Sequence, residues 1–164
     1  MSDTLKEKVL KAQQEGDIAA LYVLESLAQD TLAEQELIAY YANILDLALE
    51  NLTSALESAR KMDISEVQDF ATLRALYEYA MEHYSAGKKV DASALFEILS
   101  GLSSNETFSK AMKMHQAGAD SGMSIDNFIE KIGDVDATLL AKNFYISEFK
   151  KDAQKILDSE GKKK

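Results

Sequence analysis

The sequence contains no proline, no cysteine and no tryptophan. Without proline, no position breaks a helix by removing a backbone donor and clashing with the preceding turn. Without cysteine, disulfides and thiolate nucleophiles are excluded. The chain has no apolar run near the roughly 20 residues that a helix needs to cross a bilayer, so we expect no membrane span. Its first residues lack the charged-then-apolar profile of a signal peptide. These absences favour an all-helical protein of the cytoplasm.

Basic residues are missing from a long stretch, because no lysine or arginine lies between Lys11 and Arg60. The formal net charge of the chain is −10. Residues 1–70 hold 14 acidic and 5 basic residues, a net of −9, and residues 71–164 hold 14 and 13, a net of −1. Nucleic-acid affinity depends on basic side chains that displace counterions. We therefore expect no nucleic-acid partner. A basic protein partner is allowed, although solubility is the more ordinary role for the acidity.

An apolar ladder runs through residues 32–62 and is the strongest structural signal in the sequence. Its members alternate in steps of three and four, the a and d spacing of a helix that packs along its length against other helices. They are Ile38, Tyr41, Leu45, Ala48, Leu52, Ala55, Ala59 and Met62. The pattern predicts a long central helix over about 32–62 in an antiparallel helical bundle, with Leu45 and Leu52 in the buried seam.

Glycines and capping patterns divide the rest of the chain into shorter helices. We expect helices at about 4–15, 17–29, 32–62, 66–86, 91–102, 105–117, 124–132 and 136–159. Four of these starts have the capping-box spacing of a hydroxyl residue followed three positions later by Glu or Gln. The pairs are Thr4 with Glu7, Thr31 with Glu34, Ser65 with Gln68 and Ser103 with Glu106. The predicted fold class is all-α, with a single helical domain over residues 1–160 and a disordered basic tail at 161–164.

Residues 72–105 carry apolar and small residues at regular places around a central glycine. Counting Leu73 as position 1, they are Leu76 at 4, Tyr79 and Ala80 at 7 and 8, His83 at 11, Gly87 at 15, Ala92 at 20, Phe96 at 24 and Leu99 at 27. This spacing resembles a tetratricopeptide repeat (TPR), although Ser104 stands where that family usually has proline. The resemblance implies a TPR-like hairpin, with Gly87 in the turn and Ala80 and Ala92 at the helix contact. A generic helical hairpin shares much of this pattern.

Small acidic chains with long helices and such a hairpin also resemble the cytoplasmic chaperones and co-chaperones of flagellar and type III export. One branch of that group is built on TPR hairpins, and another on long-helix bundles that hold the C-terminal segment of a flagellin. The resemblance implies a non-enzymatic protein-binding module. Its partner would be a helical segment of a flagellin-like client or of another export chaperone, and no cofactor would be needed. A homo-oligomeric helical scaffold is an alternative.

Signatures of catalysis and metal binding are absent from the sequence. Neither His83 nor His115 has the preceding carboxylate of the Glu-x-x-His motif of di-iron bundles. No phosphate loop, dinucleotide fingerprint or nucleophile elbow is present. We therefore assign no catalytic residue and no metal ligand. The remaining enzymatic alternative is an unrecognised acid–base site at His83, with Glu82 and Tyr79 beside it.

One strip of the central helix suggests a partner-binding surface. Tyr40 and Leu47 lie seven residues apart at c positions of the heptad, outside the set that a simple bundle buries. Glu36, Asp46 and Glu50 lie near them on the same helix. An exposed apolar strip with an acidic border suits a basic amphipathic helix of a partner. The alternative is that a neighbouring helix of the same chain covers Tyr40 and Leu47.

Overall fold

A computed structural model describes residues 2–162 of the chain, which are 76% helical and contain no strand. The all-α prediction is confirmed. In chain order the helices are α1 (Ser2–Glu15), α2 (Ile18–Val23), α3 (Glu25–Thr31), α4 (Glu34–Glu57), α5 (Val67–Ser85), α6 (Lys89–Leu102), α7 (Glu106–Asp120), α8 (Ile125–Asn127), the π-helical turn η1 (Phe128–Ile132), α9 (Val135–Ala141) and α10 (Ala153–Lys162). The chain divides after Leu76, inside α5, into an N-terminal and a C-terminal unit, each compact by itself.

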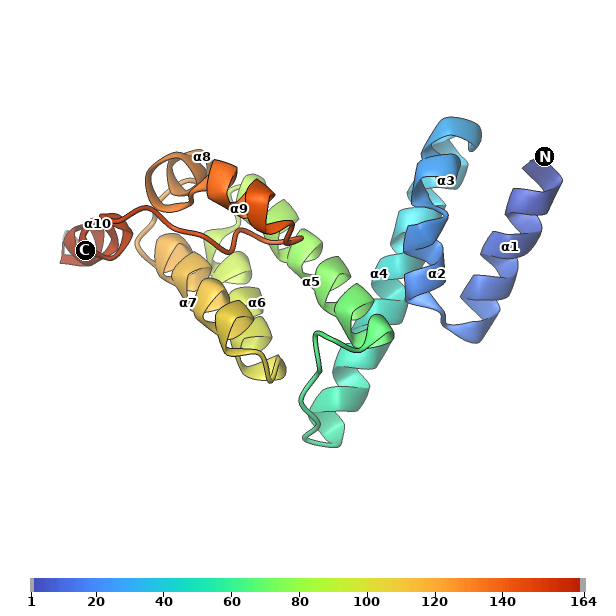
Figure 1. Ribbon diagram of the computed structural model, residues 1–164, viewed down its shortest axis with the longest axis horizontal. Coiled ribbons are helices and arrows are strands. Elements are labelled where there is room, and N and C mark those ends of the chain that lie inside the picture. Colours follow the sequence, from blue (N-terminus) through green and yellow to red (C-terminus); the bar gives the residue numbers. More distant parts are fainter. Residues whose placement is uncertain (1, 163–164) are drawn as a thin grey trace. The chain divides into compact units, whose positions relative to one another are not determined.

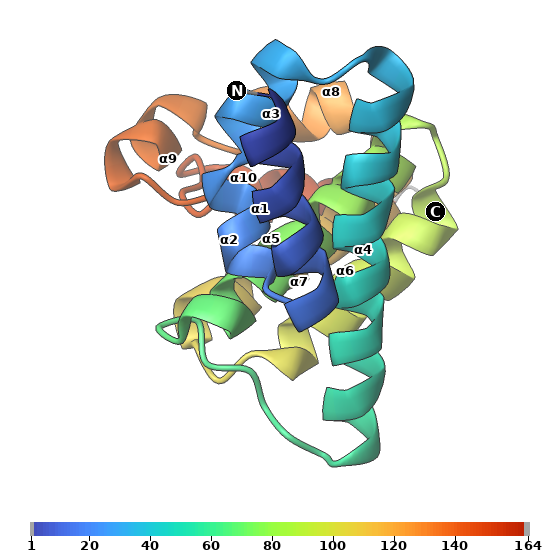
Figure 2. The same cartoon turned by 90° about the vertical axis from the view of Figure 1, so that its right-hand side faces the viewer.

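The N-terminal unit is formed by α1 to α4 and the first half of α5. In it α1 packs against α2 and α3, and α2 packs against α4. Figures 1 and 2 show α1, the α2–α3 pair and α4 running side by side. The sequence 17–29, expected as one helix, is interrupted at Leu24 between α2 and α3. The core of this unit includes Leu5, Ala12, Ile18, Leu21, Ala28, Tyr40, Ile44, Ala48 and Leu52.

The long helix α4 is continuous, with no turn near Glu50, but it ends at Glu57 rather than near residue 62. Ala59 takes a left-handed conformation with φ 54°, and the Arg60 N–H donates to the Ala55 carbonyl at 2.9 Å. This is the Schellman pattern of helix ends, made here without glycine. The expected end was wrong because an alanine supplied a stop that is usually made by glycine.

The buried stripe of α4 also differs from the expected ladder. It follows steps of four, four, four and three through Tyr40, Ile44, Ala48, Leu52 and Ala55. Leu52 is buried as expected, whereas Leu45 is only half-buried and Ile38 is 56% exposed. A straight helix has 3.6 residues per turn. Steps of four are slightly longer than one turn and heptad steps average slightly less, so either pattern forms a stripe that runs along the helix. The neighbouring helices cover the first of these two stripes.

The helix starts lie within about two residues of their expected places, but other residues cap them. Glu36 accepts from the Ala33 N–H at 3.1 Å at the start of α4, while the Thr31 hydroxyl donates to the Leu27 carbonyl. Asn105, rather than Ser103, accepts from the Phe108 N–H at 2.8 Å at the start of α7. The expected pairs Thr31–Glu34 and Ser103–Glu106 are therefore not the caps of α4 and α7. Gln68 bonds to Asp17 and Ala19 of the α2 start, and α1 already begins at Ser2, before Thr4. Any nearby short acceptor can satisfy the free N–H groups of a first turn, which is why spacing alone chose the wrong residue.

The C-terminal unit begins with a helical hairpin. Gly87, with φ 81°, joins α5 to α6, and the Lys88 N–H donates to the His83 carbonyl at 3.0 Å. Ala80 and Ala92 are both fully buried, as the hairpin pattern requires. Beyond α6, helix α7 packs along α6, and η1 packs against α7, α8 and α10. The turn at Gly87 is confirmed.

The single helix expected at 136–159 was wrong. Lys142 is left-handed, with φ 59°, and ends α9. The chain then runs extended, with an antiparallel bridge between Gly133 and Phe149 and an Asp134 N–H bond to the Glu148 carbonyl at 2.8 Å. Helix α10 follows and continues to Lys162, so it includes the first two residues of the expected tail, while residues 163 and 164 lie outside the described part. Backbone pairing with residues 132–134 therefore replaces helical pairing along this segment.

Candidate functional site

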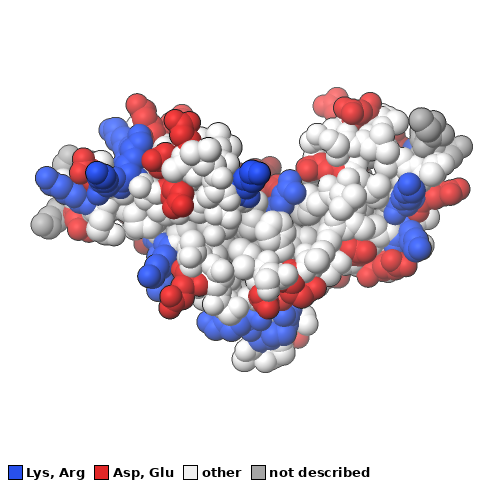
Figure 3. All heavy atoms as spheres, viewed as in Figure 1, with Lys and Arg blue, Asp and Glu red and all other residues white. Residues whose placement is uncertain are grey.

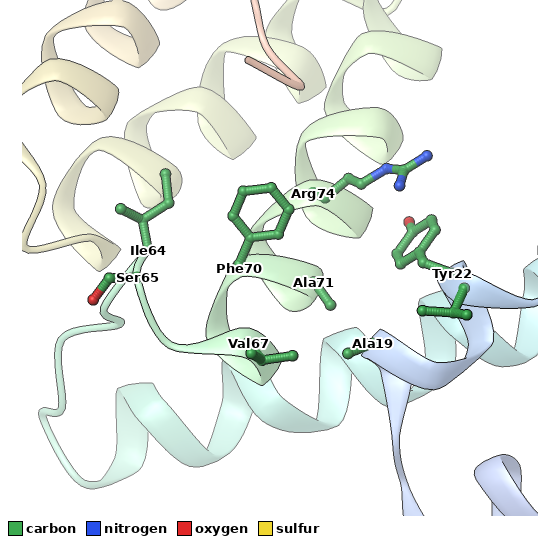
Figure 4. Close-up of a pocket in the computed structure, with 9 residues that line it drawn as sticks. Ala19, Tyr22, Ile64, Ser65, Val67, Phe70, Ala71 and Arg74 are labelled. Atoms are coloured by element: carbon green, nitrogen blue, oxygen red, sulfur yellow. The ribbon is translucent and has the colours of Figure 1, made fainter. Parts of the chain in front are cut away.

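The N-terminal unit contains an apolar cleft between α2 and the start of α5, with a volume of about 380 Å³. Figure 4 shows Ala19 and Tyr22 on α2 facing Val67, Phe70 and Ala71 on α5. The loop between α4 and α5 closes one side of the cleft. The remaining lining residues are Val23, Ile64, Ser65 and Arg74.

A polar contact fixes one end of the cleft. Asp17 caps α2 by accepting from the Ala20 N–H at 3.0 Å, and the Gln68 amide on α5 donates to the same oxygen at 2.6 Å. The hydrogen bond from Gln68, followed by that from Ala20, lowers the pKa of Asp17. One carboxylate therefore caps the start of helix α2 and holds the first turn of α5 beside it.

A second polar contact fixes the other end. The Arg74 guanidinium lies 3.9 Å from the centre of the Tyr22 ring and donates to Glu25 at 3.1 Å. A cation over an aromatic face is attracted by the ring quadrupole, and Arg74 and Glu25 are both largely shielded from solvent. The two ends together hold α2 and α5 at a fixed separation, so the cleft between them is preformed.

The loop that forms the rim of the cleft is tied to α5 through Asp69. Arg60 donates to both Asp69 oxygens, at 2.9 and 3.1 Å, and the Asp63 N–H donates at 3.0 Å. Burial by itself raises the pKa of Asp69, but the bonds from Arg60 and Asp63 outweigh it, so the pKa is lowered. A bidentate pair with an extra backbone donor is a rigid arrangement. It positions the following rim residues, Ile64 and Ser65.

Several apolar side chains that line the cleft are exposed to solvent. Val23 is 82% exposed, Val67 is 63% exposed and Phe70 is 42% exposed. Single exposed apolar residues are ordinary, but three that line one concave surface form a patch of the kind that binds a partner. The chemistry of the lining suits an apolar side chain, with Arg74 and Ser65 as polar groups at its edges.

Tyr40, expected on an exposed strip, is only 2% exposed. Its hydroxyl donates to the Leu21 carbonyl on α2, and burial raises its pKa to about 12. The expectation of exposure is wrong for Tyr40 because α2 packs over this face of α4, which was the stated alternative. Leu47, on the adjoining edge of α4, is half-buried.

The acidic residues expected beside that strip fall in two places. Glu36 is exposed near the start of α4 and pairs with Lys6 of α1 at 3.2 Å. Its hydrogen bond from the Ala33 N–H, and then its contacts with Lys6, lower its pKa. Asp46 and Glu50 are exposed further along and line a shallow hollow of about 530 Å³ together with Glu57. The structure therefore keeps Asp46 and Glu50 together and separates them from Tyr40.

The two histidines have different surroundings. His83 is half-buried in the last turn of α5, where its ring centre lies 4.6 Å from that of Tyr79, and Glu82 is exposed. His115 is fully buried, with Nδ1 2.6 Å from the Ala111 carbonyl and Nε2 2.9 Å from the Tyr77 hydroxyl. Because a carbonyl only accepts, Nδ1 carries the proton and Nε2 accepts from Tyr77. Both ring nitrogens of His115 are thus engaged in hydrogen bonds within the core.

A metal centre and a membrane-spanning helix are both missing from residues 2–162. No group of three His, Asp or Glu side chains converges there as a metal ion would require. Within the same residues, no helix combines the length and apolar character that a bilayer crossing needs. Comparison with protein-family models, with curated proteins and with solved structures found no match to this chain.

None of the residues that line the cleft was predicted as a site residue from the sequence. Val23, Val67 and Phe70 read as ordinary members of apolar faces, and α2 and α5 are separated by the whole of α4. The available signal was an excess of apolar residues near two helix ends. That signal identifies a site only when the two ends are known to be neighbours.

Proposed function

We propose that this chain is a non-enzymatic protein-binding module that receives apolar side chains of a partner polypeptide in the cleft between α2 and α5. The observation that carries the proposal is the exposure of Val23, Val67 and Phe70 around a concave surface whose ends are fixed by polar contacts. A preformed apolar cleft binds with little ordering cost, which is the property expected of a recognition site.

In its finer form, the proposal is a cytoplasmic chaperone or co-chaperone of flagellar or type III export. This form rests on the resemblance described above, and a hairpin with Gly87 in its turn and small residues at Ala80 and Ala92 is compatible with it. The partner is then a flagellin-like client or another export chaperone. A chaperone of this kind holds a helical segment stoichiometrically and carries out no reaction.

Affinity capture from the cytoplasm of a flagellated host tests both forms. The parent chain is compared with Val23→Ser combined with Val67→Ser, which removes apolar surface at two exposed positions of the cleft. The matched control is Val90→Ser combined with Leu27→Ser, because these residues are 84% and 52% exposed and lie outside the cleft. We expect the parent and the control to retain one polypeptide stoichiometrically and the cleft variant to lose at least about 90% of it, since each buried apolar side chain contributes roughly 1.5 to 3 kcal/mol.

Equal capture by the cleft variant and the parent would refute the cleft as the binding site. Absence of any flagellar or export component among the captured proteins would refute the finer form alone.

The alternative of a homo-oligomeric scaffold has one observation in its favour. Helix α9 exposes Leu139 to 69% and Leu140 to 85% side by side. Light scattering distinguishes the two functions. A scaffold of identical chains has a mass of two or more times 18.1 kDa without any partner, whereas a monomeric binding module has a mass of 18.1 kDa.

A further inference from the structure

Helix α4 carries a second apolar stripe beside the one that is buried. Its residues follow steps of four, three, four, three and four, which is strict heptad spacing. We call it the heptad stripe, and its members are Ile38, Ala42, Leu45, Leu49, Leu52 and Leu56. Ile38 is 56% exposed and Leu56 is 58% exposed, while Leu45 and Leu49 are half-buried between them. Only Leu52 belongs to both stripes.

The heptad stripe and the buried stripe lie on adjoining faces of α4. Successive residues of a helix are about 100° apart around its axis, so Leu49 stands about a quarter turn from the fully buried Ala48. Asp46 and Glu50 lie further around, beyond Leu49, and are exposed. The heptad stripe therefore has the protein core on one side and carboxylates on the other.

The charge beside the heptad stripe is of one sign. Helix α4 contains no lysine or arginine, and its acidic residues are Glu34, Glu36, Asp46, Glu50 and Glu57. Asp46, Glu50 and Glu57 line the hollow of about 530 Å³ together with Leu49, so the carboxylates and one leucine of the stripe share one concave surface. A helix that covers Leu49 therefore lies beside these carboxylates.

We propose that the heptad stripe binds a basic amphipathic helix of another protein by coiled-coil-like pairing. Apolar a and d residues of the partner cover Ile38, Leu49 and Leu56, and its flanking lysines or arginines face the carboxylates. A second copy of α4 does not fit, because it brings like charges together along the border. The inference rests on the proposed protein-binding function and names the chemistry of a partner, at a surface separate from the cleft.

A synthetic peptide of three heptads is a suitable probe, with Leu at a and d, Lys at e and g, and Ala elsewhere. Its binding to the full chain is followed by fluorescence anisotropy. We expect saturable binding that weakens at least about tenfold between about 0.05 and 0.5 M NaCl, because salt screens the acidic border. The same peptide with Glu in place of Lys should not bind. Equal binding of the two peptides, or no binding of the Lys peptide, would overturn the proposal.

Two variants locate the binding surface. Asp46→Asn, Glu50→Gln and Glu57→Gln combined remove the acidic border, and Ile38→Ser with Leu56→Ser removes the exposed ends of the stripe. We expect each variant to weaken binding about tenfold or more. The matched control is Glu82→Gln, Glu97→Gln and Asp126→Asn, which changes net charge by the same amount at exposed positions elsewhere.

Equal weakening by the control would show general attraction between a basic peptide and an acidic protein, and would overturn the assignment. Circular dichroism checks that the variants keep their helicity. If the serine variant loses helicity, the charge variant decides, because it leaves the apolar contacts of α4 unchanged.

The cleft variant separates this inference from the proposed function. Val23→Ser with Val67→Ser should bind the Lys peptide as the parent does. If cellular capture depends on the cleft but the parent chain does not bind the Lys peptide, the inference fails and the proposed function stands. If capture is independent of the cleft, the cleft proposal fails whatever the peptide does.

Discussion

At the scale of single residues, the most constrained group is the buried imidazole of His115. The Ile146 N–H donates to the Tyr77 hydroxyl at 3.1 Å, the Tyr77 hydroxyl donates to His115 Nε2, and His115 Nδ1–H donates to the Ala111 carbonyl. Every polar group in this chain of hydrogen bonds has a partner. Such a network fixes the neutral tautomer and connects α5, α7 and the extended segment of the C-terminal unit.

The stability of the protein should depend on pH through His115. Burial lowers the pKa of His115 to about 4 from an ordinary 6.5, although its bond to Ala111 acts in the opposite direction. Between these values the unfolded chain binds more protons than the folded one, so the free energy of unfolding rises with pH. Protonation of His115 is disfavoured in the folded state by about 3 kcal/mol, so this group costs no stability above pH 6.5 and lowers the free energy of unfolding progressively as the pH falls toward 4.

Urea unfolding at several pH values between about 4 and 7 measures this dependence. In His115→Gln, the slope of unfolding free energy against pH should become shallower in this range. In His83→Gln, which alters the only other histidine, it should be retained. An unchanged slope in His115→Gln would contradict the assignment.

At the scale of elements, the packing of α7 depends on the absence of a side chain at Gly118. A Cβ atom added there lies 2.5 Å from Phe128 Cδ2 and 3.3 Å from the Tyr84 hydroxyl. Phe128 is fully buried in η1, so its ring has no room to withdraw. The close approach of α7 and η1 therefore requires glycine at this position.

Gly118→Ala should lower the free energy of unfolding by about 1 to 3 kcal/mol, because overpacking shifts a fully buried ring. Gly101→Ala in α6 is the matched control, since a Cβ atom there has nothing within 4 Å. That control should be stabilised by up to about 1 kcal/mol through helix propensity. Thermal unfolding of both variants measures the difference, and an equal effect of the two substitutions would show that Gly118 is not a packing constraint.

Also at the scale of elements, helix existence was easier to predict than helix boundaries. The pattern through residues 32–62 correctly predicted one long helix, since apolar periodicity is a local property. The prediction placed Ile38 and Leu45 on the buried face, but Ile38 is exposed and Leu45 is half-buried, because the neighbouring helices cover the adjoining stripe instead. The heptad stripe is therefore left partly exposed.

At the scale of the whole molecule, composition accounts for the fold class. Far-ultraviolet circular dichroism at neutral pH should give a helix content close to 76%. A substantial strand component would contradict the fold, because the described residues have only an isolated bridge in the extended segment. On the face shown in Figure 3, acidic and basic side chains are interleaved with broad uncharged areas. Net charge alone therefore does not locate a partner surface.

The sequence by itself determined the helical class, the long helix and the turn at Gly87. Periodicity, the absence of proline and a glycine between two apolar faces act over a few residues, so they can be read without neighbours. The acidic half of the candidate heptad surface, Asp46 and Glu50, was also within reach of sequence analysis. Its apolar half was misassigned to Tyr40, which the structure buries.

Only the tertiary structure decided which stripe of α4 is covered, where the last helices end and how α2 meets α5. Burial of Tyr40 depends on the Leu21 carbonyl, nineteen residues away. The cleft depends on the contacts of Asp17 with Gln68 and of Glu25 with Arg74, which are separated by 51 and 49 residues. Contacts of this range form only when the helices are already side by side, because no local pattern specifies which partner will lie opposite.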